Sequence, residues 1–228
     1  MRDMFEIISI FEKYNVNLVL YAGTLIGFLR EKNHIKIDGG CDLIINLNKY
    51  NNILIKNEKF NPELKKEILN NGYKFVKNGA RIQKGKLLRL NLKKGERFFD
   101  FWSFLTINDK YYQSWNGARL DRKFLDDPVS IKEYHKDWNL KNILIPRYAE
   151  KLLDGIYNNY RSRTTSSGGD WRKPCKAHEA MKNCSSHPLY VYLNDDLSIY
   201  AETWIKMRPD YKREDYENND EYLNFVIT

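Results

Sequence analysis

One stretch near the start of this 228-residue chain limits the folds that the chain can adopt. Short apolar runs bounded by glycine and polar residues are typical of buried strands. The stretch contains, in order, an apolar run, a Gly-Thr turn, a helical segment, a polar loop and a second apolar run: Asn17–Tyr21, Ala22-Gly23-Thr24, Leu25–Glu31, residues 32–42 and Leu43–Leu47. This order predicts strand, turn, helix, loop and strand.

The same stretch carries residues with a recognisable chemistry. Gly23 and Thr24 follow the first predicted strand, and Asp38 and Asp42 precede the second. A turn that offers backbone N–H groups holds phosphate oxygens. Carboxylates on a loop hold a hard divalent cation such as Mg²⁺ or Mn²⁺. If the two strands are neighbours in one sheet, the turn and the carboxylates face each other, and we expect a site for a metal-bound phosphate ester.

This stretch resembles the LicD/fukutin family of phosphotransferases, which have a nucleotidyltransferase-like fold. The family pattern is roughly Tyr-Gly-Thr-Leu-Leu-Gly, an Arg, and then Ile-Pro-Trp-Asp-Asp-Asp-Ile-Asp-Ile. Residues 22–27, Ala-Gly-Thr-Leu-Ile-Gly, and Arg30 match its first part. Asp38 and Asp42 match the first and last acids of the cluster, and Gly40 stands where the middle acid would be.

The segments on either side complete an α+β pattern. Helical periodicity and helix stop signals predict three further helices in the first part of the chain, Asp3–Tyr14, Lys49–Lys56 and Asn61–Asn71. Short alternating runs between glycines predict strands at Tyr73–Lys77, Arg81–Gln83, Leu87–Leu92 and Arg97–Phe104. The predicted fold class is therefore α+β, a nucleotidyltransferase-like mixed sheet flanked by helices, with a C-terminal extension.

Asp100 interrupts the aromatic strand Arg97–Phe104. Burying a carboxylate in such a strand is costly unless a cation or several hydrogen-bond donors meet it. The family has an acid in an apolar strand of the type Val-Asp-Ile-Phe, so the resemblance implies that Asp100 is a third acid of the site. The alternative is an Asp at a strand edge that points to solvent.

A second part of the chain also resembles the family. The apolar Ile143–Pro146 leads into a predicted helix, Arg147–Tyr157, and Asp170-Trp171 precedes Pro174. A predicted hairpin, Tyr111–Lys123, lies before them, and Pro188–Leu193 reads as an added strand. The resemblance covers roughly residues 1–174, which we expect to form one LicD-like domain, and residues 175–228 form a C-terminal extension.

The extension begins with a cluster of metal-ligand residue types. Four of the seven Cys and His residues of the chain fall within thirteen positions: Cys175, His178, Cys184 and His187. Two Cys and two His can close a tetrahedral zinc site. The alternative is a helix that carries these residues incidentally.

Charge and composition constrain the partners and the compartment. The net charge of +8 suits an anionic partner such as a nucleotide-activated substrate or a phosphorylated polymer, although biased composition also explains scattered Lys. Nucleic acid is not expected, because the basic residues do not cluster with aromatics along one element. Three cysteines, no apolar run long enough for a membrane span and no signal-peptide core predict a cytoplasmic protein; a fragment of a longer chain would allow the secretory pathway.

The resemblance implies a reaction and a role for each site residue. The reaction is metal-dependent transfer of a phosphorylated alcohol, such as phosphocholine or ribitol phosphate, from a CDP-linked donor to a hydroxyl of a glycan or cell-surface polymer. The implied metal ligands are Asp38, Asp42 and Asp100, with Asp100 as general base. The implied substrate-binding residues are Gly23, Thr24, Arg30, Lys32 and, near the acceptor, Asp170.

Three other functions remain open at this point. Because Gly40 replaces an acid, the chain can be a degenerate member that binds the donor without turnover. A nucleotidyltransferase that uses a nucleoside triphosphate would share the Gly-Thr turn and the acids. A zinc-containing nucleic-acid-binding module would explain the basic charge and the Cys/His cluster, and salt-dependent retention on nucleic acid would support it.

Overall fold

The structure is a computed structural model, which describes residues 1–35, 40–83, 85–107, 110–113, 119–121, 124–156, 161, 192–193, 199–200 and 226–227. The chain divides into two compact units. The first consists of Met1–Phe104 and Leu125–Arg147, and the second of Leu105–Phe124 and Tyr148–Thr228. The predicted boundary after residue 174 lies outside the described residues.

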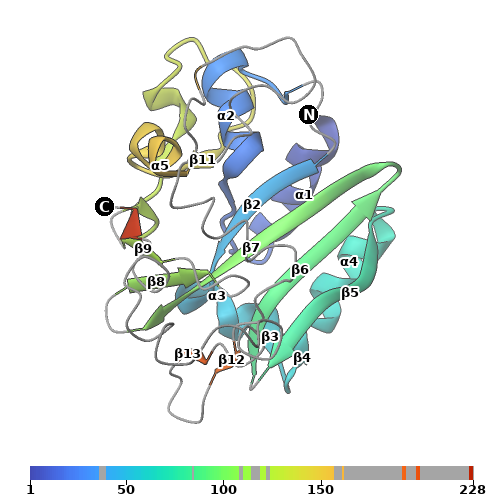
Figure 1. Cartoon of the computed structure of the whole chain (residues 1–228). Helices are drawn as coiled ribbons and strands as arrows, with labels where there is room; N and C mark the ends of the chain where they lie inside the picture. Colours follow the sequence, from blue (N-terminus) through green and yellow to red (C-terminus); the bar gives the residue numbers. More distant parts are fainter. Residues whose placement is uncertain are drawn as a thin grey trace, which may run out of the picture. The chain divides into compact units, whose positions relative to one another are not determined.

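The first unit is built on a mixed sheet, as predicted (Figure 1). Its strand order is β10-β11-β1-β2-β7-β6-β5. The pairs β1–β11 and β2–β7 are parallel, and the other neighbouring pairs are antiparallel. The strands are β1 (Val19–Leu20), β2 (Gly40–Asn46), β5 (Lys74–Gln83), β6 (Lys86–Lys94), β7 (Arg97–Ile107), β10 (Val129–Ser130) and β11 (Leu144–Ile145).

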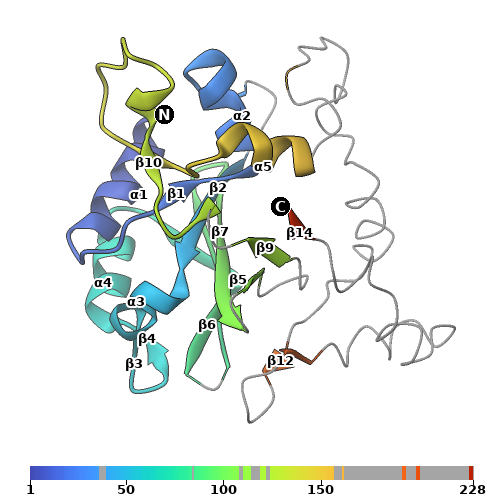
Figure 2. The same ribbon diagram turned by 90° about the vertical axis from the view of Figure 1, so that its left-hand side faces the viewer.

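Three helices cover one face of this sheet: α1 (Arg2–Glu12), α3 (Leu47–Leu54) and α4 (Pro62–Asn70) (Figure 2). The alternation of side chains along a strand places every second residue of β7 toward them. Phe11 of α1 stacks on Phe101 of β7, with ring centroids 5.2 Å apart, and the ring of Tyr73 lies edge-on to Phe99 at 5.4 Å. All four side chains are at most 2% exposed, so the core lies between these helices and the sheet.

Helix α2 (Ala22–Glu31) follows β1 directly and starts three residues earlier than the predicted helix Leu25–Glu31. The Gly-Thr turn of the prediction is therefore the first turn of this helix. The chain changes direction at Ala22, whose φ of 44° lies in the left-handed region. The segment after β10, which includes the 3-10 turn η2 (Ile131–Glu133), packs on α2: Phe28 lies 5.8 Å from Trp138 between ring centroids.

Two other predicted elements have different bounds in the structure because of their contacts with neighbouring strands. The predicted helix Lys49–Lys56 ends at Leu54, because Ile55–Lys56 (β3) pairs with Lys59–Phe60 (β4) in a small hairpin. The two predicted strands Tyr73–Lys77 and Arg81–Gln83 are one strand, β5, whose register against β6 shifts between Phe75 and Ala80. A bulge of this kind interrupts the alternation that the sequence pattern needs.

The second unit contains the described parts of the remaining chain. The strands β8 (Lys110–Gln113) and β9 (Arg119–Asp121) pair in antiparallel fashion, and β8 begins one residue before the predicted hairpin Tyr111–Lys123. The strand β14 (Val226–Ile227) pairs with β9 in parallel. The strands β12 (Tyr192–Leu193) and β13 (Ile199–Tyr200) form a second pair, and α5 (Ala149–Ile156) lies within the predicted helix. In the described part of the chain, none of the helices combines the length and apolar character that spanning a membrane would need.

Candidate active site

The central feature of the site is the parallel pair β2–β7. Asp42 of β2 lies directly opposite Asp100 of β7 in the register of this pair. Opposite residues on neighbouring strands point to the same face, and such strands lie about 4.8 Å apart. Both residues are partly buried, and Asp100 lies on a central strand rather than at a sheet edge. The structure therefore brings together two carboxylates that are 58 positions apart in the sequence.

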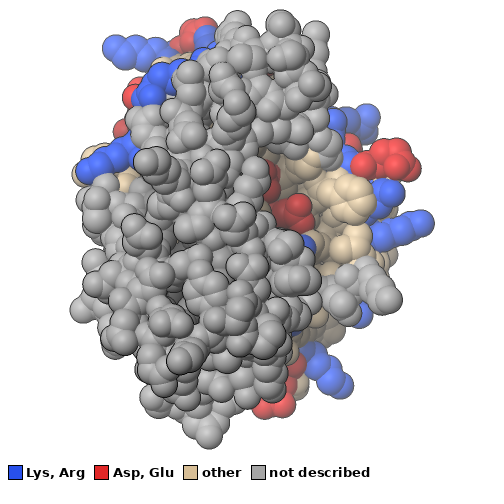
Figure 3. All heavy atoms as spheres, in the orientation of Figure 1, with Lys and Arg blue, Asp and Glu red and all other residues tan. Residues whose placement is uncertain are grey.

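These carboxylates lie on the face opposite to the helices α1, α3 and α4. The neighbours of Asp100 on β7, Phe99 and Phe101, are at most 2% exposed and belong to the helix-covered core. Phe98, which shares the face of Asp100, is 44% exposed. Figure 3 shows the acidic and basic side chains of the described residues that are visible from the direction of Figure 1.

The start of α2 is tied to the same pair of strands. β1 pairs with β2, so Leu20 lies opposite Leu43, and the backbone N–H of Tyr21 donates to the carbonyl of Asp42 at 3.1 Å. The hydroxyl Oγ1 of Thr24 accepts from the backbone N–H of Asp42 at 2.8 Å. These contacts confirm the expectation that the Gly-Thr segment lies next to the strand that carries Asp42. Thr24 itself is 1% exposed, and this hydrogen bond holds the helix start against β2.

An aromatic residue that the sequence reasoning missed contacts Asp42. The indole Nε1 of Trp102 donates to Oδ1 of Asp42 at 2.9 Å. Trp102 lies two positions after Asp100 on β7 and therefore on the same face. The ring of Tyr21 lies edge-on to the indole, with centroids 5.7 Å apart. The alternation of the strand could have placed Trp102 beside Asp100, but only the register with β2 reveals its contact with Asp42.

Polar residues continue the row of the carboxylates onto β6. Asn91 lies opposite Asp100, and its Oδ1 accepts from Nε of Arg89 at 2.9 Å. Arg89 lies opposite Trp102, and Lys93 lies opposite Phe98 with its ammonium 5.1 Å from the ring centroid. The row of Asp42, Asp100 and Asn91 is thus flanked on each side by an aromatic residue and a cation. The alternation in residues 87–94 indicates this polar face, but not the strand that it adjoins.

The two predicted cations lie toward the other end of α2. Lys32 follows Thr24 by eight positions, about 12 Å along a helix, and forms an ion pair with Asp137. The side chain of Arg30 is 10% exposed and pairs with Glu31 at 2.7 Å. The structure therefore does not bring Lys32 next to Asp42, and it buries Arg30 within the domain.

Several predicted residues lie outside the described part of the chain. They are Asp38, Asp170, Cys175, His178, Cys184 and His187. Among the residues with described positions, no group of three or more Cys, His, Asp and Glu side chains is arranged to hold a metal ion. The zinc site and the place of Asp38 in the metal site therefore remain predictions.

The donor set of the described site nevertheless fits Mg²⁺ or Mn²⁺. Both are hard cations that prefer oxygen ligands, and Mg²⁺ is commonly held by one or two carboxylates, waters and phosphates of the substrate. Asp42 and Asp100 supply two carboxylates on one face. A cation there would also offset the repulsion between two like charges on adjacent strands.

The charge of Asp42 also affects two buried neighbours. Burial is the main cause that raises the pKa of the Cys41 thiol and of the Tyr21 hydroxyl, and the Asp42 carboxylate raises both further. A thiol with a raised pKa is a poor nucleophile because little thiolate forms. Cys41, which is fully buried, is therefore a packing residue and not a covalent catalyst.

The lowered pKa of His34, which follows α2, leads us to expect that the stability of the protein depends on pH. Burial lowers its pKa to about 4, and the positive charges of the amino terminus and Arg97 act in the same direction. In the unfolded chain the pKa is about 6.5, so the unfolded state takes up a proton first as the pH falls. The stability that neutral His34 supports should be complete above pH 6.5 and be lost progressively toward pH 4.

This dependence can be measured by urea unfolding of the wild type and His34→Gln between pH 7.5 and pH 5. We expect the stability difference between the two proteins to stay nearly constant above about pH 6.5 and then to change to the disadvantage of the wild type as the pH falls to 5. A difference that stays constant with pH would contradict the low pKa of His34.

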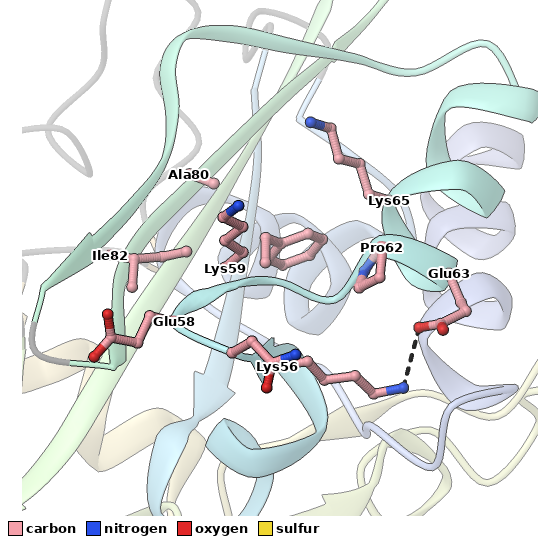
Figure 4. A pocket seen from close by; sticks show the side chains of 10 residues that line it. Lys56, Glu58, Lys59, Pro62, Glu63, Lys65, Ala80 and Ile82 are labelled. Atoms are coloured by element: carbon pink, nitrogen blue, oxygen red, sulfur yellow. Dashed lines mark hydrogen bonds and ion pairs between the residues drawn. The ribbon is translucent and has the colours of Figure 1, made fainter.

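A separate concavity lies beside the β3–β4 hairpin (Figure 4). It has a volume of about 680 Å³, and its lining includes Lys56, Lys59, Lys65, Glu58 and Glu63. Lys56 is paired with Glu63 at 3.0 Å, so part of its positive charge is offset. None of the predicted site residues lines it, and the sequence analysis did not anticipate it.

The arrangement defines a class of protein. Two carboxylates lie in register on the sheet face opposite to the helices α1, α3 and α4, and the helix that follows the adjacent strand starts beside them. This is a nucleotidyltransferase-like domain. The family model described as LicD/FKTN/FKRP, nucleotidyltransferase domain, matches residues 15–140. The match spans more than half of the chain, and the protein therefore belongs to the LicD/FKTN/FKRP family, whose members are generally transferases.

The matched range includes some of the predicted site residues and leaves others out. It contains Thr24, Asp42 and Asp100, and it ends before Asp170 and before the Cys/His cluster. No curated protein matches the chain.

Proposed function

We propose that this protein transfers a phosphorylated alcohol from a CDP-linked donor to a hydroxyl of a glycan or cell-surface polymer, in a reaction that requires Mg²⁺ or Mn²⁺. The observation that carries this proposal is the register pair Asp42–Asp100 on the sheet face opposite to α1, α3 and α4, next to the first turn of α2. Membership of the family supports the reaction class. The choice of a CDP-linked donor and of a glycan or polymer acceptor is more specific than the reaction class and belongs to the proposal alone.

The chain's own residues have distinct roles in this reaction. Asp42 and Asp100, with Asp38, would hold the cation, which neutralises phosphate charge and aligns the reacting oxygens. Asp100 is also our candidate for the general base that takes the proton of the acceptor hydroxyl. The acceptor oxygen then forms a bond to the phosphorus that carries the alcohol, and the bond from that phosphorus to cytidine monophosphate breaks.

The start of α2 suits the diphosphate of the donor. Tyr21 precedes the helix without a side-chain cap, and a helix N-terminus offers backbone N–H groups and a positive dipole end to an anion. Gly23 lies in this first turn, and Thr24 fixes the turn against Asp42. In our proposal the phosphate oxygens bind here, while the roles of Arg30 and Lys32 are to offset phosphate charge at longer range.

Gly40 is the reason for a second candidate function, that of a family member that binds the donor without turnover. Gly40 lies two positions before Asp42 on β2, so the two residues face the same side of the sheet. The substitution Gly40→Asp would therefore add a carboxylate on the site face, opposite Phe98. Two carboxylates can suffice for Mg²⁺ when phosphates complete the coordination, and for this reason we favour an active enzyme.

The test is release of cytidine monophosphate from CDP-choline, CDP-ribitol and CDP-glycerol with Mg²⁺ or Mn²⁺. We expect metal-dependent release by the wild type and its loss in Asp42→Ala. Activity that appears only in Gly40→Asp would support the donor-binding candidate instead. Turnover of nucleoside triphosphates with none of the CDP donors would overturn the proposal in favour of a nucleotidyltransferase.

A further inference from the structure

Trp102 holds one oxygen of a proposed metal ligand. Its indole N–H donates to Oδ1 of Asp42 at 2.9 Å, and Tyr21 packs edge-on against the indole at 5.7 Å. An indole offers one donor in the plane of its ring and no acceptor. A carboxylate, by contrast, can rotate and accept with either oxygen. The contact therefore fixes the orientation of the Asp42 carboxylate and directs Oδ2 away from the indole.

Trp102 departs from the family pattern given above. In the family pattern Val-Asp-Ile-Phe, a phenylalanine follows the acid by two positions, and a phenylalanine has no donor. Here Asp100-Phe101-Trp102 places an N–H at that point. Gly40 contributes no carboxylate on the same face. With one acid fewer, the orientation of Asp42 matters more for any cation that binds here.

We propose that Trp102 is a positioning residue, which orients Asp42 as a one-oxygen ligand for Mg²⁺ or Mn²⁺. This inference rests on the proposed function, because it presupposes a cation at Asp42 and Asp100. Partners that orient a metal ligand are typically worth about 10–100-fold in metal affinity. The contribution of Trp102 should therefore appear in the affinity for the cation itself, before any turnover.

The experiment compares Mn²⁺ affinity in Trp102→Phe and Trp138→Phe, with free Mn²⁺ measured by electron paramagnetic resonance. Trp138 is a matched control because its Nε1 also donates at 2.9 Å, to the carbonyl of Lys141, in a segment away from the carboxylates. We expect Trp102→Phe to weaken Mn²⁺ binding by about 10-fold or more and Trp138→Phe to leave it unchanged. Melting temperatures without metal show how much each variant loses through packing alone.

The results separate this inference from the proposed function. If the wild type binds no Mn²⁺, the proposed metal site fails and the inference fails with it. If the wild type and Trp102→Phe bind Mn²⁺ equally, the metal site stands and the positioning role is overturned. As a last check, Trp102→Phe should not lower the Mn²⁺ affinity any further when it is combined with Asp42→Asn. An equal loss of Mn²⁺ affinity in that background would mean that Trp102 acts on the fold and not through Asp42.

Discussion

Replacement of Asp100 by Asn is expected to reduce metal-dependent release of cytidine monophosphate by at least about 10²–10³-fold, the usual cost of removing one electrostatic group from an active site. Asparagine keeps the shape of the side chain but removes its charge and its ability to take a proton. Because Asp100 lies directly opposite Asp42, the substitution also removes a repulsion between like charges. The melting temperature without metal should therefore stay level or rise while activity is lost.

The control for this prediction is Glu96→Gln. Glu96 lies in the turn before β7, four positions from Asp100, and its side chain is 99% exposed. The same change of carboxylate to amide should leave activity unchanged there. Added Mn²⁺ should raise the melting temperature of the wild type and of Glu96→Gln but not that of Asp100→Asn. Activity in Asp100→Asn close to that of the wild type would exclude Asp100 from the reaction.

Replacement of Gly27 by Ala is expected to destabilise the protein by about 2 kcal/mol, within the usual cost of overpacking. A Cβ at this position would lie 2.4 Å from the carbonyl oxygen of Asn33 and 2.9 Å from the amide nitrogen of Ile35. Both are backbone atoms, so the loop after α2 would have to move. In an exposed helix the same substitution would stabilise by about 1 kcal/mol, so the expected sign is the reverse of the intrinsic preference.

Urea unfolding of Gly27→Ala and Gly85→Ala tests this contact. Gly85 has a φ of 69°, and a Cβ there would meet no atom within 4 Å. Its substitution should cost only the backbone strain of an alanine in the left-handed region, about 1 kcal/mol. Gly27→Ala should cost more than this control. If Gly27→Ala is as stable as the wild type, the close approach of the loop to α2 does not constrain the fold.

The local pattern of the sequence was sufficient to predict many of the helices and strands. Apolar periodicity predicted α1, α2, α4 and α5, and the alternating runs predicted β6 and β7 within a few residues. The succession of strand, helix and second strand was confirmed, because hydrophobic spacing and helix stop signals act over a few neighbouring residues. The separate Gly-Thr turn was wrong, since α2 begins at Ala22. The family motif also identified Asp42 and Asp100 as candidates before any contact was known.

Tertiary structure decided how these parts meet. The sequence did not reveal that β2 pairs with β7 in parallel and with Asp42 opposite Asp100, because the register depends on packing between segments far apart in the chain. It did not reveal the hydrogen bond from Trp102 to Asp42, nor the burial of Thr24, for the same reason. The sequence by itself determined which residues have the chemistry for the site. Only the sheet register decided which of the described candidates share one face, since a shift of one residue would turn Asp42 toward the helices.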